Sequence, residues 1–425
     1  MIFIKSIPST KENIQKQINT LAVFFLIFSF FTLPFSLALH NISYAFAIIL
    51  ALPSIRTSFQ KTKKEPLTYV LLALILLITI TATYSLSSWS GALGDNFKKY
   101  LKIGLAALLL PLLTQEKTRK YCMQGFFIGM VFILLSTYLS IWFHLPWSSN
   151  KNLGWGGDHT VFGNYITQNI MMSFFTLLCI HQLSKEKSFF TNFLLIIAII
   201  SSAISTLYLS SGRTGYLTLF LGIAAYIVFR LPTKLSIISL SLVFIVGLFS
   251  FNTSKVLQTR YQQAKEETTL IFKQANTGET PALTSIGARW YMWMKSIELI
   301  QEKPLTGWGL GSHGVKWCEK APEPEWCAVG DTTPHNQFIF FFTEMGVLGF
   351  FWFLTLLATL IWAAWSNQIY RPLFMGFIAI FIGDSLVNAS LWNAREYNFF
   401  IIMLCWLYCS AKFSAKTIIP TNAKS

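Results

Sequence analysis

Long apolar runs, separated by short polar segments, dominate the pattern along this chain. Twelve of the runs approach the roughly 20 mostly apolar residues that a helix needs to cross a bilayer. They cover residues 19–39, 42–55, 67–86, 100–114, 122–143, 161–181, 189–209, 214–230, 235–251, 346–365, 373–388 and 398–411. The second and fourth runs are short. The pattern predicts an all-α polytopic membrane protein with about 12 transmembrane helices.

Composition supports this prediction. Hydrophobic residues make up 53% of the 425 positions and charged residues 12%, whereas soluble domains carry about 25% charged residues. A net charge of +15 would suggest nucleic-acid binding in a soluble protein. In a polytopic chain, the excess of Lys and Arg in cytoplasmic segments explains the same charge. We therefore expect membrane lipids, and no nucleic acid, around the protein.

The distribution of Lys and Arg predicts the orientation. With the N-terminus placed in the cytoplasm, the inner segments contain 18 of these residues and the short outer segments 6. An even number of spans returns the C-terminus to the cytoplasm. The six outer cations are Lys98, Lys99, Lys102, Lys151, Arg213 and Arg395.

The long segment 252–334 lies outside in this topology, and it is the one place with room for a large periplasmic loop subdomain. Its residues 255–273 and 289–301 have helical spacing. The sequence thus predicts that the chain has three parts. They are residues 1–251 with nine spans, 252–345 with the loop subdomain and a motif helix, and 346–425 with three spans and a cytoplasmic tail.

Two of the six cysteines lie in the outer loop. Cys318 and Cys327 flank eight residues, and each follows a Trp. An oxidising compartment allows a disulfide at this spacing, and two free thiols are the alternative. Only His313 is nearby, so a zinc site is not expected.

Two outer arginines are candidates for binding an anion. Arg213 lies between two spans, where the charge rule disfavours it, and Arg289 starts an aromatic-rich helix. A guanidinium matches phosphate oxygens bidentately. The alternatives are an arginine that reaches lipid headgroups and a solvated arginine beside an interfacial aromatic belt.

His335 is the candidate general base. Pro334 suits the first turn of a helix, which places His335 near a helix N-terminus whose dipole disfavours imidazolium. A neutral imidazole accepts a proton at neutral pH. The alternative is a polar residue at a helix start, hydrogen-bonded to backbone.

Acidic residues in or near apolar runs are further candidates. Glu344 and Asp384 either pair with an arginine or bind a polar substrate, and Glu396 either joins them or forms a surface ion pair with Arg395. Asp158 and His159, in a loop rich in Gly and Trp, suit sugar stacking or an interfacial turn. No Walker loop, dinucleotide motif, HExxH, GxSxG or Asp-x-Asp pair is present. We expect no metal and no cofactor.

Three motifs together resemble a known family, the bacterial O-antigen ligase and O-oligosaccharyltransferase superfamily. His335-Asn336, nine residues and then Gly346-Val347-Leu348-Gly349 match its H-N-x9-G-x-x-G pattern. Arg289 to Trp293, followed by Pro304 to Gly309, resembles its R-x3-W and P-x-x-G-x-G segments. Ser211-Gly212-Arg213 resembles its Ser-x-Arg segment, with Gly212 where many relatives have serine.

The resemblance implies a GT-C-like membrane glycosyltransferase of the bacterial inner membrane, with its active site at the periplasmic face. Arg213 and Arg289 would hold the pyrophosphate of an undecaprenyl-pyrophosphate-linked glycan donor. His335 would deprotonate an acceptor hydroxyl on lipid A–core, which attacks the anomeric carbon with inversion. Asn336 would support His335, and either Asp384 or Glu396 would match a late acidic residue of the family. Neither metal nor ATP would be needed.

Other functions remain open. A protein O-oligosaccharyltransferase, which glycosylates Ser or Thr of a protein such as a pilin, fits the same motifs. An O-antigen polymerase fits the paired arginines and, less well, the histidine motif. A transporter of lipid-linked glycans is the alternative that is not an enzyme, although the broken helix pairs of transporters are not evident.

Overall fold

The computed structural model describes residues 10–184, 187–277 and 279–414, and within them it contains helices and no strands. Both chain ends were predicted to lie in the cytoplasm, and both fall outside the described residues. The helices are α1 (Thr10–Thr32), α2 (Leu37–Ala51), η1 (Leu52–Ser54), α3 (Ile55–Thr62), α4 (Pro66–Ala82), α5 (Ala92–Leu105), η2 (Ala106–Leu108), α6 (Leu110–Leu113), α7 (Glu116–Leu139), α8 (Tyr165–Gln182), α9 (Phe189–Tyr208), α10 (Arg213–Arg230), α11 (Thr233–Thr253), α12 (Lys255–Thr277), α13 (Ser285–Glu302), α14 (His313–Lys320), α15 (Pro324–Gly330), α16 (Gln337–Trp365), α17 (Arg371–Ser385) and α18 (Ala394–Phe413).

Five described helices are long and apolar enough to cross a bilayer: α1, α7, α9, α11 and α16. Helices α2 and α4 are apolar and shorter. Side chains such as Ile238 and Phe244 on α11 are about two-thirds exposed, which a soluble protein avoids over a whole helix. The chain is therefore an all-helical membrane protein. Each of the twelve predicted runs overlaps a helix, and twelve as the number of spans stays a prediction.

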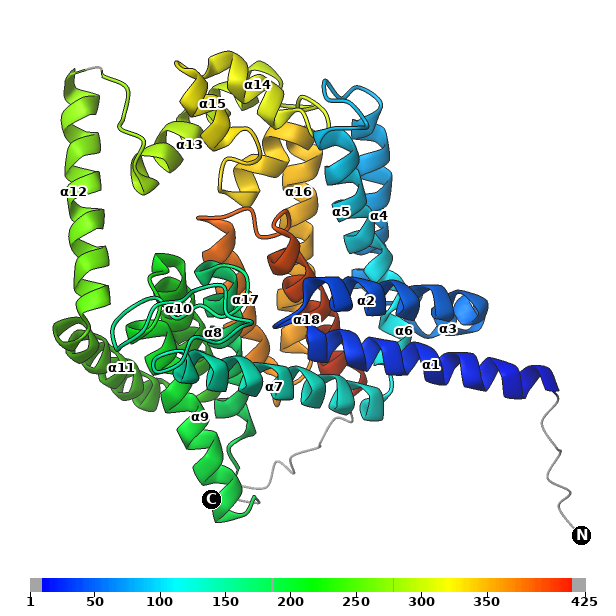
Figure 1. The fold of residues 1–425 in the computed structure, drawn as a ribbon. Helices are drawn as coiled ribbons and strands as arrows, with labels where there is room; N and C mark the ends of the chain where they lie inside the picture. Colours follow the sequence, from blue (N-terminus) through cyan, green and yellow to red (C-terminus); the bar gives the residue numbers. More distant parts are fainter. Residues whose placement is uncertain (1–9, 185–186, 278, 415–425) are drawn as a thin grey trace, which may run out of the picture.

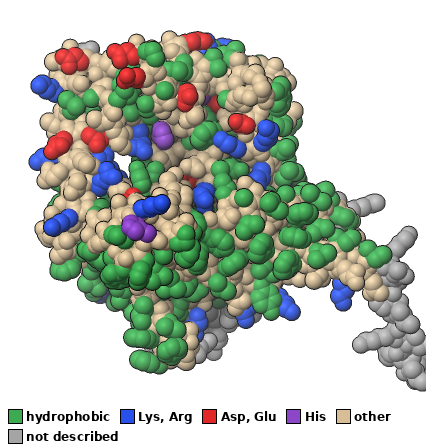
Figure 2. Space-filling view, viewed as in Figure 1, with side chains coloured by type: hydrophobic (Ala, Val, Ile, Leu, Met, Phe, Trp, Pro, Cys, Tyr) green, Lys and Arg blue, Asp and Glu red, His purple; other side chains and the backbone are tan. Residues whose placement is uncertain are grey.

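The polar segment forms a separate layer. Figure 1 shows α12 to α15 at the top of the view, above the bundle that contains α8, α10, α17 and α18. In Figure 2, acidic and basic side chains gather in that upper part, and hydrophobic side chains cover most of the lower part. Lys and Arg side chains, together with acidic ones, border an opening in the upper part of Figure 2.

Two predicted spans are shorter than expected because the chain breaks near a proline. The run 100–114 is divided into α5, η2 and α6, with Pro111 in the first turn of α6. The run 42–55 ends in η1, which contains Pro53, and the short helix α3 follows. Proline lacks the N–H of an internal helical turn, so it favours the start of a new helix.

Helix α16 begins earlier than the predicted span. It starts at Gln337 and continues past Gly346, which has φ 62° and ψ −156° and interrupts the helical backbone. The predicted division between residues 345 and 346 therefore falls inside one kinked element rather than between two. Pro334 is not in the first turn, so that prediction is wrong.

Candidate functional site

Arg213 is the first residue of α10 and forms an ion pair that the sequence did not predict. Its Nη2 donates to Glu267 Oε1 at 2.7 Å, and its Nη1 donates to Glu267 Oε2 at 3.3 Å. Glu267 lies on α12, and its Oε2 also accepts the backbone N–H of Ile286 at 2.8 Å. One carboxylate thus joins the starts of α10 and α13 to the middle of α12.

The charge of Glu267 is stabilised by these donors. Burial by itself would raise the pKa of Glu267, but the hydrogen bonds from Arg213 and Ile286 outweigh it, so its pKa lies below the ordinary value. The Arg213 guanidinium therefore already faces a bidentate oxyanion. This geometry is the one that a phosphate group would use.

Arg289 lies on α13 and lacks such a partner. Its Nη1 donates to the backbone oxygen and to the Oγ of Ser285, at 3.2 and 2.8 Å. Its buried Nε has no hydrogen-bond partner, and no carboxylate in the described residues lies within ion-pair distance of it. Burial, followed by the nearby Arg213 charge, lowers the pKa of Arg289. An anion beside Arg289 would offset both unfavourable effects.

The two arginines line one cavity of about 230 Å³. The other lining residues are Thr214, Leu217, Ile286, Trp290, Trp293 and Val387. Cations from two helices thus face a space whose remaining walls are mostly apolar and aromatic. Such a wall lowers the local dielectric and strengthens the attraction for an anion.

His335 lies just before α16 in a strained backbone conformation. Its φ of 51° is the only positive φ of a non-glycine residue in the described part of the chain. Such a conformation costs about 1–3 kcal/mol and persists where the surroundings impose it. Trp293 Nε1 donates to the backbone oxygen of Pro334 at 2.9 Å. The helix that carries Arg289 therefore also holds the loop that carries His335.

The imidazole of His335 is neutral at pH 7. Burial, and then the positive charge of Arg289, lower its pKa to about 4, while a side-chain hydrogen bond with Asn388 acts in the opposite direction. The predicted neutral state agrees with this pKa, although the causes are burial and Arg289 rather than the helix dipole. A ligand anion on Arg289 would raise this pKa toward the range of an effective base.

Asn336 is the N-cap of α16 and uses both ends of its side chain. Its Oδ1 accepts the N–H groups of Phe338 and Ile339 at 3.0 and 3.1 Å. Its Nδ2 donates to the backbone oxygen of Leu386 at 3.0 Å. Asn336 thus fixes the turn after α17 against the start of α16, next to His335.

Asp384 and Glu396 are both buried, and they differ in what they contact. Asp384 accepts hydrogen bonds from Asn388 Nδ2 at 2.7 Å and from Ser390 Oγ at 2.6 Å. Asn388 in turn bonds His335. Glu396 accepts from Thr167 Oγ1 at 3.1 Å. Asp384 is therefore linked to His335, and the hydrogen bond of Glu396 leads to α8.

The predicted surface ion pair of Glu396 with Arg395 is wrong. Glu396 is 2% exposed, and no ion pair joins it to Arg395 in the described residues. Residue 395 precedes residue 396 at the start of α18, and consecutive helical residues point in directions about 100° apart. Arg395 instead packs its guanidinium against Gly163.

Part of the sequence matches a known family. Residues 195–354 match the family model of the O-antigen ligases. This part of the chain belongs to the O-antigen ligase family. The matched segment contains Arg213, Arg289 and His335, and members of the family are glycosyltransferase-like ligases. Asp384 and Glu396 lie outside it.

One curated relative shares part of the sequence. An uncharacterized protein of Haemophilus influenzae is 27% identical over 154 residues, which are 35% of this chain and 37% of that protein. The match therefore spans little more than a third of either chain. Because that relative is uncharacterized, the match gives no further information about activity.

The glycines of the ligase motifs have a packing role. Trp308 N donates to Thr343 O, and Gly309 N donates to Glu344 O, both at 2.9 Å. Gly307 and Gly346 both have positive φ, and a Cβ on Gly307 would lie 2.5 Å from Gly346 N. The loop thus packs backbone to backbone onto the kink of α16, which side chains would prevent.

Glu344 reinforces that contact. Its Oε1 accepts the Gly311 N–H at 2.9 Å and Asn96 Nδ2 at 3.1 Å, and the residue is 1% exposed. The sequence suggested an arginine or a substrate as its partner, and the structure gives it backbone and amide donors. In the ligase domain Glu344 therefore has a structural role.

The outer face of α13 is covered by a disulfide-linked helix pair. The sulfurs of Cys318 on α14 and Cys327 on α15 are bonded to each other. Trp317 and Trp326, which precede them, pack against Tyr291 of α13 with ring centroids 5.9 and 4.6 Å away. This cluster fixes the side of α13 away from the arginine cavity.

The loop 154–159 is held by its own polar groups. Asp158 Oδ2 accepts Ser211 Oγ at 2.7 Å, and Asp158 Oδ1 accepts the Thr160 N–H at 3.0 Å. The imidazole of His159 contacts the Gly154 oxygen at 2.7 Å. The bonds tie this loop to the segment just before Arg213, and sugar stacking by the loop stays a prediction.

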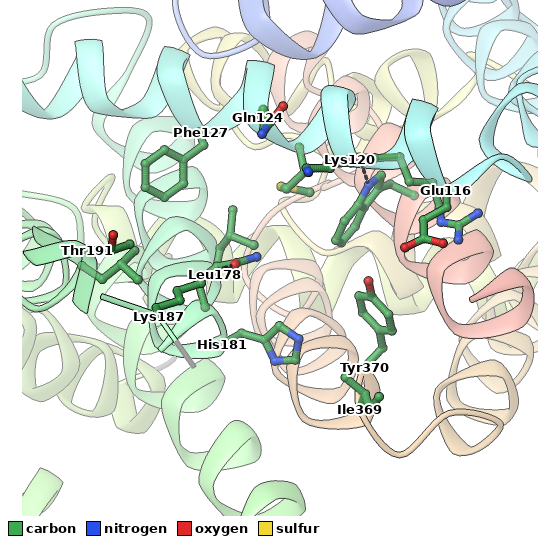
Figure 3. Close-up of a pocket in the computed structure, with 15 residues that line it drawn as sticks. Glu116, Lys120, Gln124, Phe127, Leu178, His181, Lys187, Thr191, Ile369 and Tyr370 are labelled. Carbon is green, nitrogen blue, oxygen red and sulfur yellow. Dashed lines mark hydrogen bonds between the residues drawn. The ribbon is translucent and has the colours of Figure 1, made fainter. Parts of the chain in front are cut away.

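A second cavity lies away from the arginines. It measures about 480 Å³ and is lined by residues of α7, α8, α9 and α18 and of the turn before α17. Figure 3 shows Lys120 and Glu116 on one side of it, and His181 and Tyr370 on the other. It shares no residue with the arginine cavity. The described residues contain no group of three or more His, Cys, Asp or Glu side chains that could hold a metal ion.

Proposed function

We propose that this protein is an O-antigen ligase. In this proposal it transfers a glycan from undecaprenyl pyrophosphate to a sugar hydroxyl of lipid A–core, at the periplasmic face of the bacterial inner membrane. The observation that carries the proposal is that Arg213 and Arg289 line one cavity within a ligase-family segment, and that Arg289 is close enough to lower the pKa of His335. The twelve-span, GT-C-like topology predicted from the sequence would place this cavity outside.

The arginines would act on the leaving group. When the bond between the anomeric carbon and the phosphate oxygen breaks, negative charge increases on the pyrophosphate. Arg289, which has an unpaired buried Nε, would donate to one phosphate. Arg213 would donate both to Glu267 and to the second phosphate of the pyrophosphate. Fixed donors aimed at the developing charge lower the barrier, and in this mechanism they replace a metal ion.

His335 would act on the acceptor. An unprotonated imidazole nitrogen accepts the proton of the acceptor hydroxyl as its oxygen forms a bond to the anomeric carbon. The new glycosidic bond forms on the face opposite the leaving pyrophosphate, so the configuration inverts. The proton later leaves His335 for water or for the released pyrophosphate. The transfer needs no ATP, because the donor phosphoester is already activated.

The test is a transfer assay with purified protein and undecaprenyl-pyrophosphate-linked glycan, in EDTA and without ATP. Lipid A–core and a pilin-like protein are supplied in parallel as acceptors. Glycan on the lipid supports the ligase. Glycan on the protein alone would make the chain an O-oligosaccharyltransferase with the same residues in use. Intact donor with both acceptors would contradict the proposal and favour a polymerase or a transporter.

A further inference from the structure

A third cavity lies between α2, α5 and α18. It measures about 450 Å³. Its lining residues are Asn41, Tyr44, Ala45, Ile48, Ile49, Lys98, Lys99, Leu101, Lys102, Leu105 and Tyr397. We refer to this cavity as the lysine groove. It shares no residue with the arginine cavity or with the cavity of Figure 3.

The three lysines are unusual in the predicted topology. Lys98, Lys99 and Lys102 account for half of the six cations in the short outer segments. Outer segments of membrane proteins are generally poor in Lys and Arg. The charge bias that sets membrane orientation therefore does not explain these three lysines, because lysines on the outer side oppose that bias. We infer that they have a local role.

The lysines are held mainly by aromatic and amide groups. Lys99 Nζ lies 3.5 Å from the ring centroid of Trp392, and Lys102 Nζ lies 4.6 Å from that of Tyr44. Lys102 also donates to Asn41 Oδ1. The only carboxylate paired with any of the three in the described residues is Asp95, 3.8 Å from Lys98 and highly exposed like it. The residues that line the groove thus include three lysines and no carboxylate.

The rest of the groove is apolar. Leu101 and Leu105 continue along α5 beyond the lysines, and Ile48 and Ile49 face the groove from α2. Ile49 is 57% exposed, as expected for a side chain that contacts lipid tails. A cationic end followed by an apolar floor matches a phosphate group attached to acyl chains.

The groove is joined to the candidate active site by one turn of chain, residues 386–393. Val387 in this turn lines the arginine cavity, and Asn388 bonds His335. Trp392, at the other end, contacts Lys99 and donates from Nε1 to Asn96 Oδ1 at 2.8 Å. A ligand in the groove would thus lie on one end of the turn and the glycan donor on the other.

We propose that the lysine groove binds the phosphate-bearing lipid portion of the glycan acceptor. This inference rests on the proposed transferase function and assigns a separate subsite to the phosphorylated lipid of its acceptor. Lys98, Lys99 and Lys102 bind the phosphate, and the acyl chains lie along Leu105 and Ile49. The sugar part extends past Trp392 toward His335.

The test uses the full-length protein in lipid nanodiscs with two acceptors, lipid A–core and the same molecule after phosphatase treatment. The wild-type chain should show an acceptor KM about tenfold higher for the dephosphorylated lipid, the loss expected for charge-assisted hydrogen bonds. The K98Q/K102Q variant should show the same increase with the intact lipid. Its kcat and its donor KM should stay close to wild type. Removing the phosphate should then have little further effect on the variant.

The matched control is K120Q/K187Q, which removes two lysines from the cavity of Figure 3. It should leave the acceptor KM unchanged. The arm with wild-type protein and dephosphorylated lipid involves no substitution, so misfolding of a variant does not affect it. Equal KM values for the two lipids, or an unchanged KM in K98Q/K102Q, would overturn the groove assignment while leaving the transferase intact.

Direct binding separates the two proposals. Lipid binding to the wild-type chain without donor should be about tenfold weaker after dephosphorylation, and weaker by a similar factor in K98Q/K102Q. If no acceptor is glycosylated but this binding pattern is found, the proposed function fails and the lipid site stands. If phosphatidylglycerol vesicles compete as well as lipid A–core, the groove is a general phospholipid site and the acceptor assignment is wrong.

Discussion

The Asn388 side-chain amide donates to Asp384 Oδ1 at 2.7 Å, and the same side chain hydrogen-bonds the His335 imidazole. Nδ2 faces Asp384 and, at 3.5 Å, Thr214 Oγ1, which leaves Oδ1 to accept an imidazole N–H. One imidazole nitrogen is then a donor and the other is free to accept a proton. Asp384 thus orients His335 through Asn388.

This relationship predicts that Asn388→Ala lowers kcat. Loss of the hydrogen bond releases the imidazole ring and its tautomer, and we expect a decrease of about 10- to 100-fold, similar to the loss of other supporting contacts. The donor KM should stay unchanged. Asp384→Asn should act in the same direction. Steady-state kinetics on both variants give the measurement, and an unchanged kcat in Asn388→Ala would show that the bond has no positioning role.

The arginines should differ in their sensitivity to replacement. Lysine keeps the charge but loses the bidentate geometry, so Arg213→Lys and Arg289→Lys should both lose most of their activity. The loss should be larger for Arg289, by about tenfold, because Arg213 is already shared with Glu267. Arg260→Lys on α12 is the matched control. Full activity in both variants would instead support lipid anchoring.

The pH dependence should follow His335. Its folded-state pKa of about 4 lies below the ordinary 6.5, so the unfolded chain binds more protons between these values. Stability from this group is therefore present above pH 6.5 and decreases as the pH falls to about 4. The acid limb of kcat/KM should lie near pH 4. Arg289→Gln should move it to higher pH, whereas Arg289→Lys, which keeps the charge, should not. An identical limb in both variants would contradict the assignment.

The contact between Gly307 and Gly346 predicts a stability effect. Gly307→Ala should destabilise the protein by more than the roughly 1 kcal/mol typical of strain at positive φ, because its Cβ would lie 2.5 Å from Gly346 N. Gly154→Ala is the control, since Gly154 has φ +84° with no atom within 4 Å of the added Cβ. Thermal unfolding in detergent should show the larger decrease for Gly307→Ala, and equal decreases would exclude a role for the contact.

Local pattern predicted the helices well, because a run of apolar residues determines a membrane helix almost alone. It failed where a single residue changes the backbone, as at Pro111, at Gly346 and at Pro334, which lies before the helix rather than in it. Motif order predicted that Arg213, Arg289 and His335 act together. The two arginines line one cavity, and Trp293, which also lines it, donates to the backbone oxygen of Pro334 next to His335.

Contacts between residues far apart in the chain could not be predicted from the sequence. Glu267, which pairs with Arg213, lies on a polar helix among other charged residues, and nothing in its neighbourhood distinguishes it. Asn388 has no motif, and its link to His335 depends on α17 packing beside α16. Glu344 was singled out for its apolar surroundings, but its partners, Gly311 and Asn96, come from other parts of the chain.

The central claim is that His335 is the general base of a metal-free glycan transfer. The most direct measurement compares His335→Ala with His144→Ala, an exposed histidine in the loop after α7, in the transfer assay with EDTA. Both proteins should accumulate in the membrane to wild-type levels. His335→Ala should lose about 10²- to 10⁴-fold in rate, and His144→Ala should retain full activity. Normal transfer by His335→Ala would contradict the mechanism.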